Sequence, residues 1–101
     1  MDNIPNDLKD LFVSEVRLKI LKLMLTQPEE QYHVRAIVRA VDAEINAVRR
    51  ELAKLEGMSL LSNRQSGNRL YYKADTSHIY YRELLALVTK EDGVGGLLLK
   101  N

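Results

Sequence analysis

The chain has 101 residues, of which 46% are hydrophobic and 29% are charged, and these values favour one small folded domain over a disordered chain. It contains no cysteine, no visible secretory signal and no apolar run of the roughly 18 residues that cross a membrane. Disulfides and thiolate metal sites are therefore excluded, and we expect a cytoplasmic protein with no membrane partner.

Residue types that carry catalysis are scarce. The chain has two histidines, His33 and His78, for which we predict surface or capping roles. It shows no Ser-His-Asp order, no phosphate-binding glycine loop and no cluster of metal ligands. We therefore expect that the protein is not an enzyme and that it holds no cofactor and no metal ion.

The charge is unevenly distributed, although the net charge is only +1. The stretch from Ser14 to Lys73 holds 11 basic and 7 acidic residues, whereas the two flanks together hold 4 basic and 7 acidic residues. A basic centre with acidic ends is compatible with nucleic-acid binding.

Helices are predicted first along the chain. A short helix is expected from Pro5 to Phe12, and Ser14 is a suitable N-cap for a mostly buried helix that starts at Glu15 and stops before Pro28. A polar link follows, and then a two-turn amphipathic helix carries its apolar residues at helical spacing: Val34, Ile37, Val38 and Val41.

The next helix is predicted from Ala43 to Glu56, after Asp42 as a breaking and capping residue and with Glu44 in its first turn. It buries four apolar residues: Ile45, Val48, Leu52 and Leu55. Two helices joined by so short a turn form a helix-turn-helix unit.

Two strands are predicted after these helices, Leu60–Gln65 and Arg69–Ala74, around a turn in which Gly67 and Asn68 adopt positive φ angles. In the second strand an apolar face (Leu70, Tyr72, Ala74) alternates with a basic one (Arg69, Tyr71, Lys73). A last helix is expected from a cap at Ser77 to about Glu91.

This order predicts a mainly α fold with a small β-hairpin (α+β), the winged helix-turn-helix arrangement. The run from Asn46 to Leu52, the pair Leu60-Leu61 and the run from Gly67 to Tyr72 resemble ArsR-like winged-helix regulators of bacteria and archaea. The resemblance covers about residues 11–87 and implies DNA binding.

Two departures from the family pattern matter. Ser59 stands where the family usually has glycine, so the helix is expected to end sooner, at Gly57, and the family's metal-binding cysteine pair is missing.

The predicted function is sequence-specific binding of double-stranded DNA by a homodimeric transcriptional regulator, through a recognition helix (about 43–56) and a hairpin wing (about 62–73). On the helix, Asn46 and Arg50 point most directly away from the core, and arginine and asparagine can read guanine and adenine edges. Basic side chains of the wing can lie along phosphates. The predicted DNA-binding residues are Arg35, Asn46, Ala47, Arg49, Arg50, Lys54, Arg64, Asn68, Arg69, Tyr71 and Lys73.

The last helix carries two overlapping apolar stripes, Tyr80, Leu84, Leu87 and Tyr81, Leu85, Val88. One stripe can cover the core, which leaves the other for dimerisation, as in similar regulators that dimerise through terminal helices. We therefore predict a domain over residues 1–91 with flanking dimerisation helices, and a C-terminal tail over residues 92–101.

Two alternatives remain at this point. The chain could be a winged-helix module for protein–protein contact, in which case binding would be insensitive to salt. It could also be the DNA- or RNA-binding head of a nucleotidyltransferase-linked regulator, in which case the chain would continue after Asn101.

Overall fold

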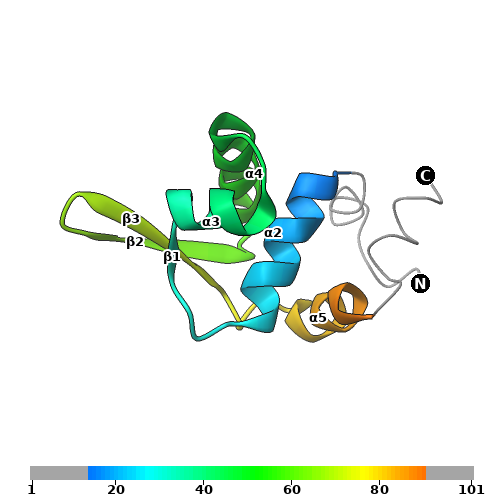
Figure 1. The fold of residues 1–101 in the computed structure, drawn as a ribbon. Coiled ribbons are helices and arrows are strands. Elements are labelled where there is room, and N and C mark those ends of the chain that lie inside the picture. Colours follow the sequence, from blue (N-terminus) through cyan, green and yellow to red (C-terminus); the bar gives the residue numbers. More distant parts are fainter. Residues whose placement is uncertain (1–13, 91–101) are drawn as a thin grey trace.

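In the computed structural model, which describes residues 14–90, the first helix is α2 at Glu15–Thr26 (Figure 1). Ser14 caps it as predicted, because its side-chain oxygen accepts a hydrogen bond from the backbone N–H of Arg17 at 3.2 Å. The helix ends two residues before Pro28, also as predicted. The predicted helix at Pro5–Phe12 and the tail at residues 92–101 lie outside the described residues.

The helix-turn-helix segment consists of α3 (Val34–Val41) and α4 (Ile45–Gly57). Asp42 has a left-handed φ of 54° and closes α3, its N–H donating to the carbonyl of Val38 at 2.9 Å. The prediction that Asp42 caps the next helix is therefore wrong. Glu44 is the N-cap of α4, with its carboxylate accepting from the first-turn N–H groups, so α4 begins two residues later than predicted.

The end of α4 closes in a Schellman motif. Ser59 has a φ of 63°, its N–H donates to the carbonyl of Glu56 at 2.9 Å, and the N–H of Leu60 donates to the carbonyl of Leu55 at 3.0 Å. The helix ends at Gly57 as expected, but Gly57 does not supply the left-handed residue, because Ser59 adopts that geometry without being a glycine.

Replacing Ser59 with glycine is expected to stabilise the protein by about 0.5–1 kcal/mol, because glycine removes the steric cost of a side chain at positive φ. The backbone hydrogen bonds of the motif do not use the serine side chain. Urea unfolding measures the difference, with Ser62→Gly in an exposed strand position as the control, which should lower stability. Equal losses in both variants would contradict the assignment of strain to Ser59.

Three antiparallel strands form one sheet in the order β1-β3-β2. The strands are β1 (Tyr32–His33), β2 (Leu61–Ser66) and β3 (Arg69–Ala74). The hairpin between β2 and β3 turns at Gly67 and Asn68 as predicted, but only Gly67 has a positive φ (62°). The strand β1 was not predicted. It pairs only Tyr32 with Tyr72 and His33 with Tyr71, and two residues are too few to show an alternating pattern.

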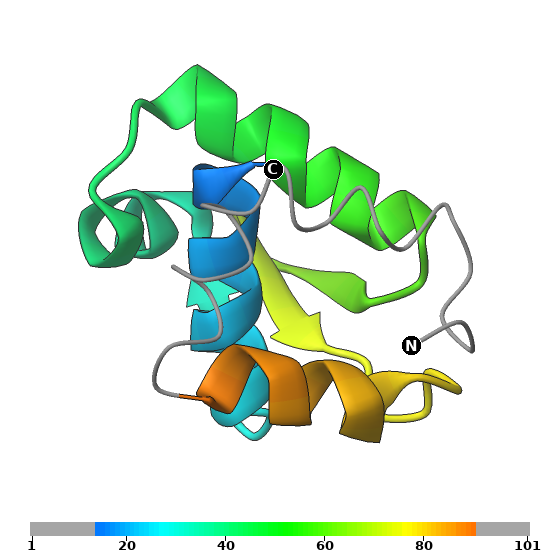
Figure 2. The same cartoon turned by 90° about the vertical axis from the view of Figure 1, so that its right-hand side faces the viewer.

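The core lies between the helices and one face of this sheet. Helix α4 crosses one side of the described structure and α5 (Tyr81–Thr89) the other, with α2 between them (Figures 1 and 2). The four helices and three strands of residues 14–90 thus form a small α+β domain. The fully buried side chains are mostly branched aliphatics: Leu18, Ile20, Leu21, Met24, Leu25, Ile37, Val48, Leu52, Leu55, Leu60 and Leu84.

The start of α5 differs from the prediction. Ser77 does not cap the helix. Its N–H and hydroxyl both donate to the Asp75 carboxylate, at 3.0 and 2.6 Å, which closes a turn before the helix. The residue in the N-cap position is Tyr80, which has no side-chain capping bond, and its N–H donates to Nδ1 of His78 at 3.0 Å.

The prediction that one apolar stripe of the last helix stays free is wrong for α5. Leu84 and Val88, one from each predicted stripe, are both buried. The remaining members of the two stripes are half-buried against the same core, and the Tyr81 hydroxyl donates to the carbonyl of Leu25 at 2.8 Å. The two stripes are the halves of one wide apolar face, and the homodimer remains a prediction.

Candidate nucleic-acid interface

The outer face of α4 carries polar side chains away from the core. Burial of Val48, Leu52 and Leu55 fixes the inward side of the helix. About 100° per residue then turns Asn46 and Arg50 to the opposite side, and both are exposed. Among the other predicted contacts of this helix, Arg49 and Lys54 are exposed and Ala47 is half-buried.

The carboxylates of α4 are all engaged in structural interactions. Glu44 caps the helix, Glu51 accepts from the Nε of Arg17 in α2 at 2.5 Å, and Glu56 accepts from the side-chain amide of Asn63 in β2. Within residues 14–90, neither of the two ion pairs involves the basic side chains of the helix, Arg49, Arg50 and Lys54. Within α4 the exposed charged side chains are therefore all basic.

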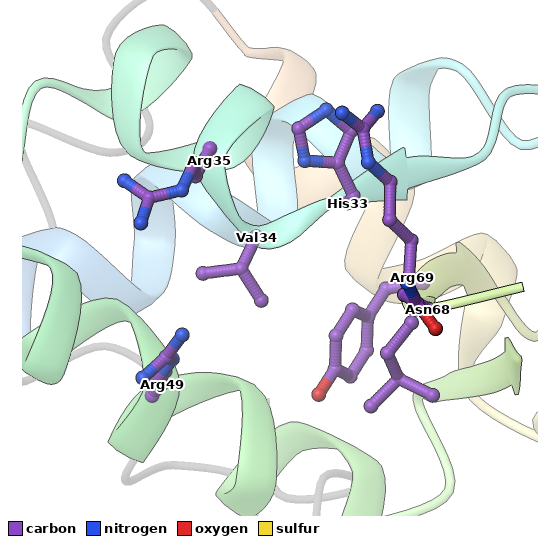
Figure 3. A pocket seen from close by; sticks show the side chains of 8 residues that line it. His33, Val34, Arg35, Arg49, Asn68 and Arg69 are labelled. Atoms are coloured by element: carbon purple, nitrogen blue, oxygen red, sulfur yellow. The ribbon is translucent and has the colours of Figure 1, made fainter.

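A pocket of about 550 Å³ lies between the N-terminus of α3, the flank of α4 and the tip of the hairpin. Arg35 and Arg49 approach it from the two helices, Arg69 and Asn68 come from the hairpin, and Val34 lies between them (Figure 3). The remaining lining residues are His33, Leu70 and Tyr72. No lining residue is acidic, so the pocket favours an anion.

Tyr72 forms part of the pocket wall next to α4. Burial raises the pKa of its hydroxyl above the ordinary 10.0, and the charge of Glu56 raises it further, while the charge of Arg49 opposes them. Both charged residues belong to α4, which packs beside the sheet. The pocket therefore joins three segments that are far apart in the sequence, and it brings together four predicted contacts: Arg35, Arg49, Asn68 and Arg69.

The hairpin residues divide between two faces of the sheet. Directly paired residues of antiparallel strands point to the same side, and successive residues alternate. Tyr72 and its partner Asn63 face α4. By the same register Arg64, Tyr71 and Lys73 lie on the other face, so the structure does not bring these three predicted contacts together with the outer face of α4.

Leu70 is not buried, although the predicted alternation places it on the apolar face of the second strand. It belongs to the same face as Tyr72, but it is 37% exposed because residues 62–70 of the hairpin project beyond the core (Figure 1). The apolar face of β3 therefore ends at Tyr72, and the hairpin tip is exposed on both sides.

Three residues near the interface were not among the predicted DNA contacts. His33 precedes α3 without a side-chain capping bond and lines the pocket, Gln31 accepts a hydrogen bond from Nη2 of Arg64 at 3.0 Å, and Glu44 caps α4. Only Glu44 had a usable signal, because an acidic residue just before an apolar period is a common helix start.

The Glu44 cap makes α4 sensitive to acid. The N–H of Asn46 lowers the pKa of this carboxyl below its ordinary 4.5, and the N–H of Ala47 and the charge of Arg50 lower it further, against desolvation. Because the folded-state pKa is the lower one, the stabilisation is present above the unfolded pKa and is lost as pH falls through the folded pKa.

We therefore expect Glu44→Gln to lower the melting temperature slightly at pH 7, and the difference from the wild type to shrink as the pH is lowered towards about 3, because protonation of Glu44 removes its charge. Thermal unfolding followed by circular dichroism at both pH values measures it. Glu29→Gln, at an exposed position after α2, is the matched control and should show little difference at either pH. A Glu44→Gln difference that persists in acid would contradict the charge effect.

Within residues 14–90, no group of three or more His, Asp or Glu side chains is placed to hold a metal ion. In the same range the structure has no helix of the length and apolar character needed to cross a membrane. A comparison of the sequence with models of known protein families gives no match. A search of curated protein sequences also finds no relative.

Proposed function

We propose that this protein is a winged helix-turn-helix regulator of transcription that binds double-stranded DNA in a sequence-specific manner. In this proposal α4 is the recognition helix, and the β2–β3 hairpin is the wing. The observation that carries the proposal is the charge exposed on α4 (Ile45–Gly57): Glu51 and Glu56 are half-buried against Arg17 and Asn63, while Arg49, Arg50 and Lys54 are exposed and form no ion pair within residues 14–90.

The geometry of the outer face suits the major groove. A helix with side chains fits this groove, where arginine can pair with the guanine edge and asparagine with the adenine edge. Asn46 lies in the first turn of α4, the part that contacts base edges in helix-turn-helix proteins. Ala47 beside it is small enough for a close approach.

The pocket supplies a place for the DNA backbone. Arg35, Arg49 and Arg69 come from three elements and surround a space without carboxylates. Like charges gathered in this way are favoured when an anion lies among them. When a duplex lies along α4, one of its phosphates supplies that anion. Asn68 at the hairpin tip can then contact the backbone of the same DNA strand.

The resemblance to ArsR-like regulators adds the biological role and the homodimer. The left-handed Ser59 supports it, since this is the conformation that the glycine of that family provides at the same position. A two-fold dimer presents two copies of α4 to half-sites about one helical turn apart, roughly 34 Å, on an imperfect palindrome.

Selection of bound sequences from a random duplex library tests this function. We expect one enriched sequence with two inverted half-sites, bound with an affinity that falls steeply as salt rises. Enrichment of a single half-site would contradict the dimer, and an absence of any enrichment would contradict sequence-specific binding. Sedimentation of the protein with and without the selected duplex checks the dimer independently.

Neutralising one arginine of the pocket should weaken all duplexes alike. For Arg35→Gln or Arg49→Gln we expect similar losses on selected and scrambled duplexes, with the slope of log affinity against log salt reduced by about one. Arg82→Gln, on the exposed outer side of α5, is the control and should leave the slope unchanged. A loss confined to the selected duplex would instead mean that these side chains read bases.

A further inference from the structure

The second face of the sheet is largely exposed within residues 14–90. The register places His33, Tyr71 and Arg64 side by side across the three strands, and Lys73 beside Ser62. We call these five residues the open sheet face. Their side chains are exposed or half-buried, in contrast to Tyr72, Ala74 and Leu61 on the other face, which are buried.

The open sheet face is basic. Arg64 and Lys73 are exposed, and none of its five residues is acidic. Arg64 donates to the side-chain oxygen of Gln31, a neutral acceptor that holds the guanidinium in place without cancelling its charge. Arg69 continues the same face at the hairpin tip, paired with Ser66. The charge of this surface is complementary to a polyanion.

An aromatic pair lies in the middle of these charges. The rings of His33 and Tyr71 meet edge to face, with their centroids 5.9 Å apart. Along β3, Arg69 and Lys73 flank Tyr71 at about 7 Å on either side, the spacing of alternate strand residues. An aromatic ring between cations provides a π-face for a base and charges for the adjoining phosphates.

We propose that the open sheet face binds an unpaired nucleic-acid strand, with a base stacked on Tyr71 and its phosphates held by Arg64 and Lys73. A duplex keeps its bases stacked inside and offers none to this ring, whereas a single strand does. An acidic protein segment would satisfy the cations but would leave the aromatic pair without a role.

This site adjoins the proposed duplex interface: His33 and Arg69 also line the pocket, whereas Tyr71, Arg64 and Lys73 do not. The open sheet face is opposite the face that meets α4 through Asn63 and Tyr72. Base contacts on α4 and stacking on Tyr71 therefore use different side chains, so either binding activity can be lost without the other.

Fluorescence anisotropy with the full chain tests the proposal. The probes are labelled 12-nucleotide strands of deoxythymidine and of uridine, which do not pair with themselves, and a random duplex of equal length. For Tyr71→Ala we expect about a 5- to 100-fold loss of affinity for the single strands and less than a twofold change for the duplex. Tyr71→Phe, which keeps the ring, should bind like the wild type. The ratio of DNA to RNA affinity shows which strand the face prefers.

Two control variants, one on the opposite face of the sheet and one on α4, locate the site. Gln65→Ala changes the other face of β2 and should leave single-strand binding intact, while Arg50→Gln should weaken the duplex alone. Thermal unfolding verifies that each variant folds. If Tyr71→Ala does not fold, Arg64→Gln and Lys73→Gln decide, each expected to reduce the salt slope for single strands by about 0.7.

Three results would overturn the proposal. The first is that the wild type binds neither single strand at about 50 mM salt, a low concentration that favours binding to phosphates. The second is an equal loss for single strands and duplex when Tyr71 or the two cations are replaced. The third is displacement of the labelled strand by polyglutamate as readily as by unlabelled strand, which would indicate a surface for acidic chains.

Discussion

Replacing Arg50 or Asn46 with alanine is expected to reduce the affinity for the selected duplex about 5- to 150-fold, or roughly 1–3 kcal/mol, and to reduce the preference over a scrambled duplex by a similar factor. Both side chains lie on the outer face of α4, opposite the buried Val48 and Leu52, so their truncation removes base contacts without opening the core. Gel-shift titrations of the two duplexes measure both quantities.

The matched control for this pair is Arg82→Ala, which removes the same charge from the exposed side of α5, on the opposite side of the described structure (Figure 2). It should leave the preference unchanged, and all three variants should unfold at the same urea concentration as the wild type. Unchanged preference in both α4 variants would remove α4 from the role of recognition helix.

The ion pair between Arg17 and Glu51 is expected to have the largest effect on stability. It joins α2 to α4 with 9% and 15% of the two side chains exposed, and the Nε–Oε1 distance is 2.5 Å. Glu51→Ala leaves a nearly buried guanidinium without this carboxylate, so we expect a loss of about 3 kcal/mol in the free energy of unfolding. Urea unfolding at neutral pH measures it.

The same helix offers a control of the opposite kind. Lys19 and Glu15 form an exposed pair at 3.7 Å, and Glu15→Gln should cost less than about 0.5 kcal/mol because solvent screens both charges. The double variant Arg17→Met with Glu51→Leu should recover most of the loss, since an apolar pair of similar size replaces the buried charges. Similar costs for Glu51→Ala and Glu15→Gln would show that the α2–α4 pair behaves as a surface pair.

Local patterns predicted the helices and the hairpin well. Apolar residues at helical spacing placed α2 and α3, and Pro28 and Gly67 marked a helix end and a turn. These features depend on a few neighbouring residues, because helical spacing and turn geometry are properties of the local backbone. The errors in the predicted helix ends are also local. At each of these ends two residues close in the sequence could take the same position: Asp42 or Glu44, Gly57 or Ser59, and Ser77 or Tyr80.

The candidate interface was predictable as a set of residues but not as an arrangement. The exposed outer face of α4 follows from its own periodicity. In contrast, the pocket depends on how α3 and the hairpin pack beside α4, and the strand β1 forms only because β3, some 40 residues later in the chain, pairs with it. The predicted wing contacts also divide: Asn68 and Arg69 at the hairpin tip line the pocket, whereas Arg64, Tyr71 and Lys73 belong to the sheet face away from α4 and do not.

Periodicity in this chain thus specifies which residues share a face, and long-range packing specifies what each face meets. The two stripes of the last helix show the difference: their spacing was read correctly, yet α5 buries Leu84 and Val88 together because the core it covers is wider than either stripe. The charge on α4 shows it as well. Its sequence contains acids and bases in similar number, but Glu51 and Glu56 are half-buried against partners from other elements, Arg17 and Asn63, while the three bases stay exposed.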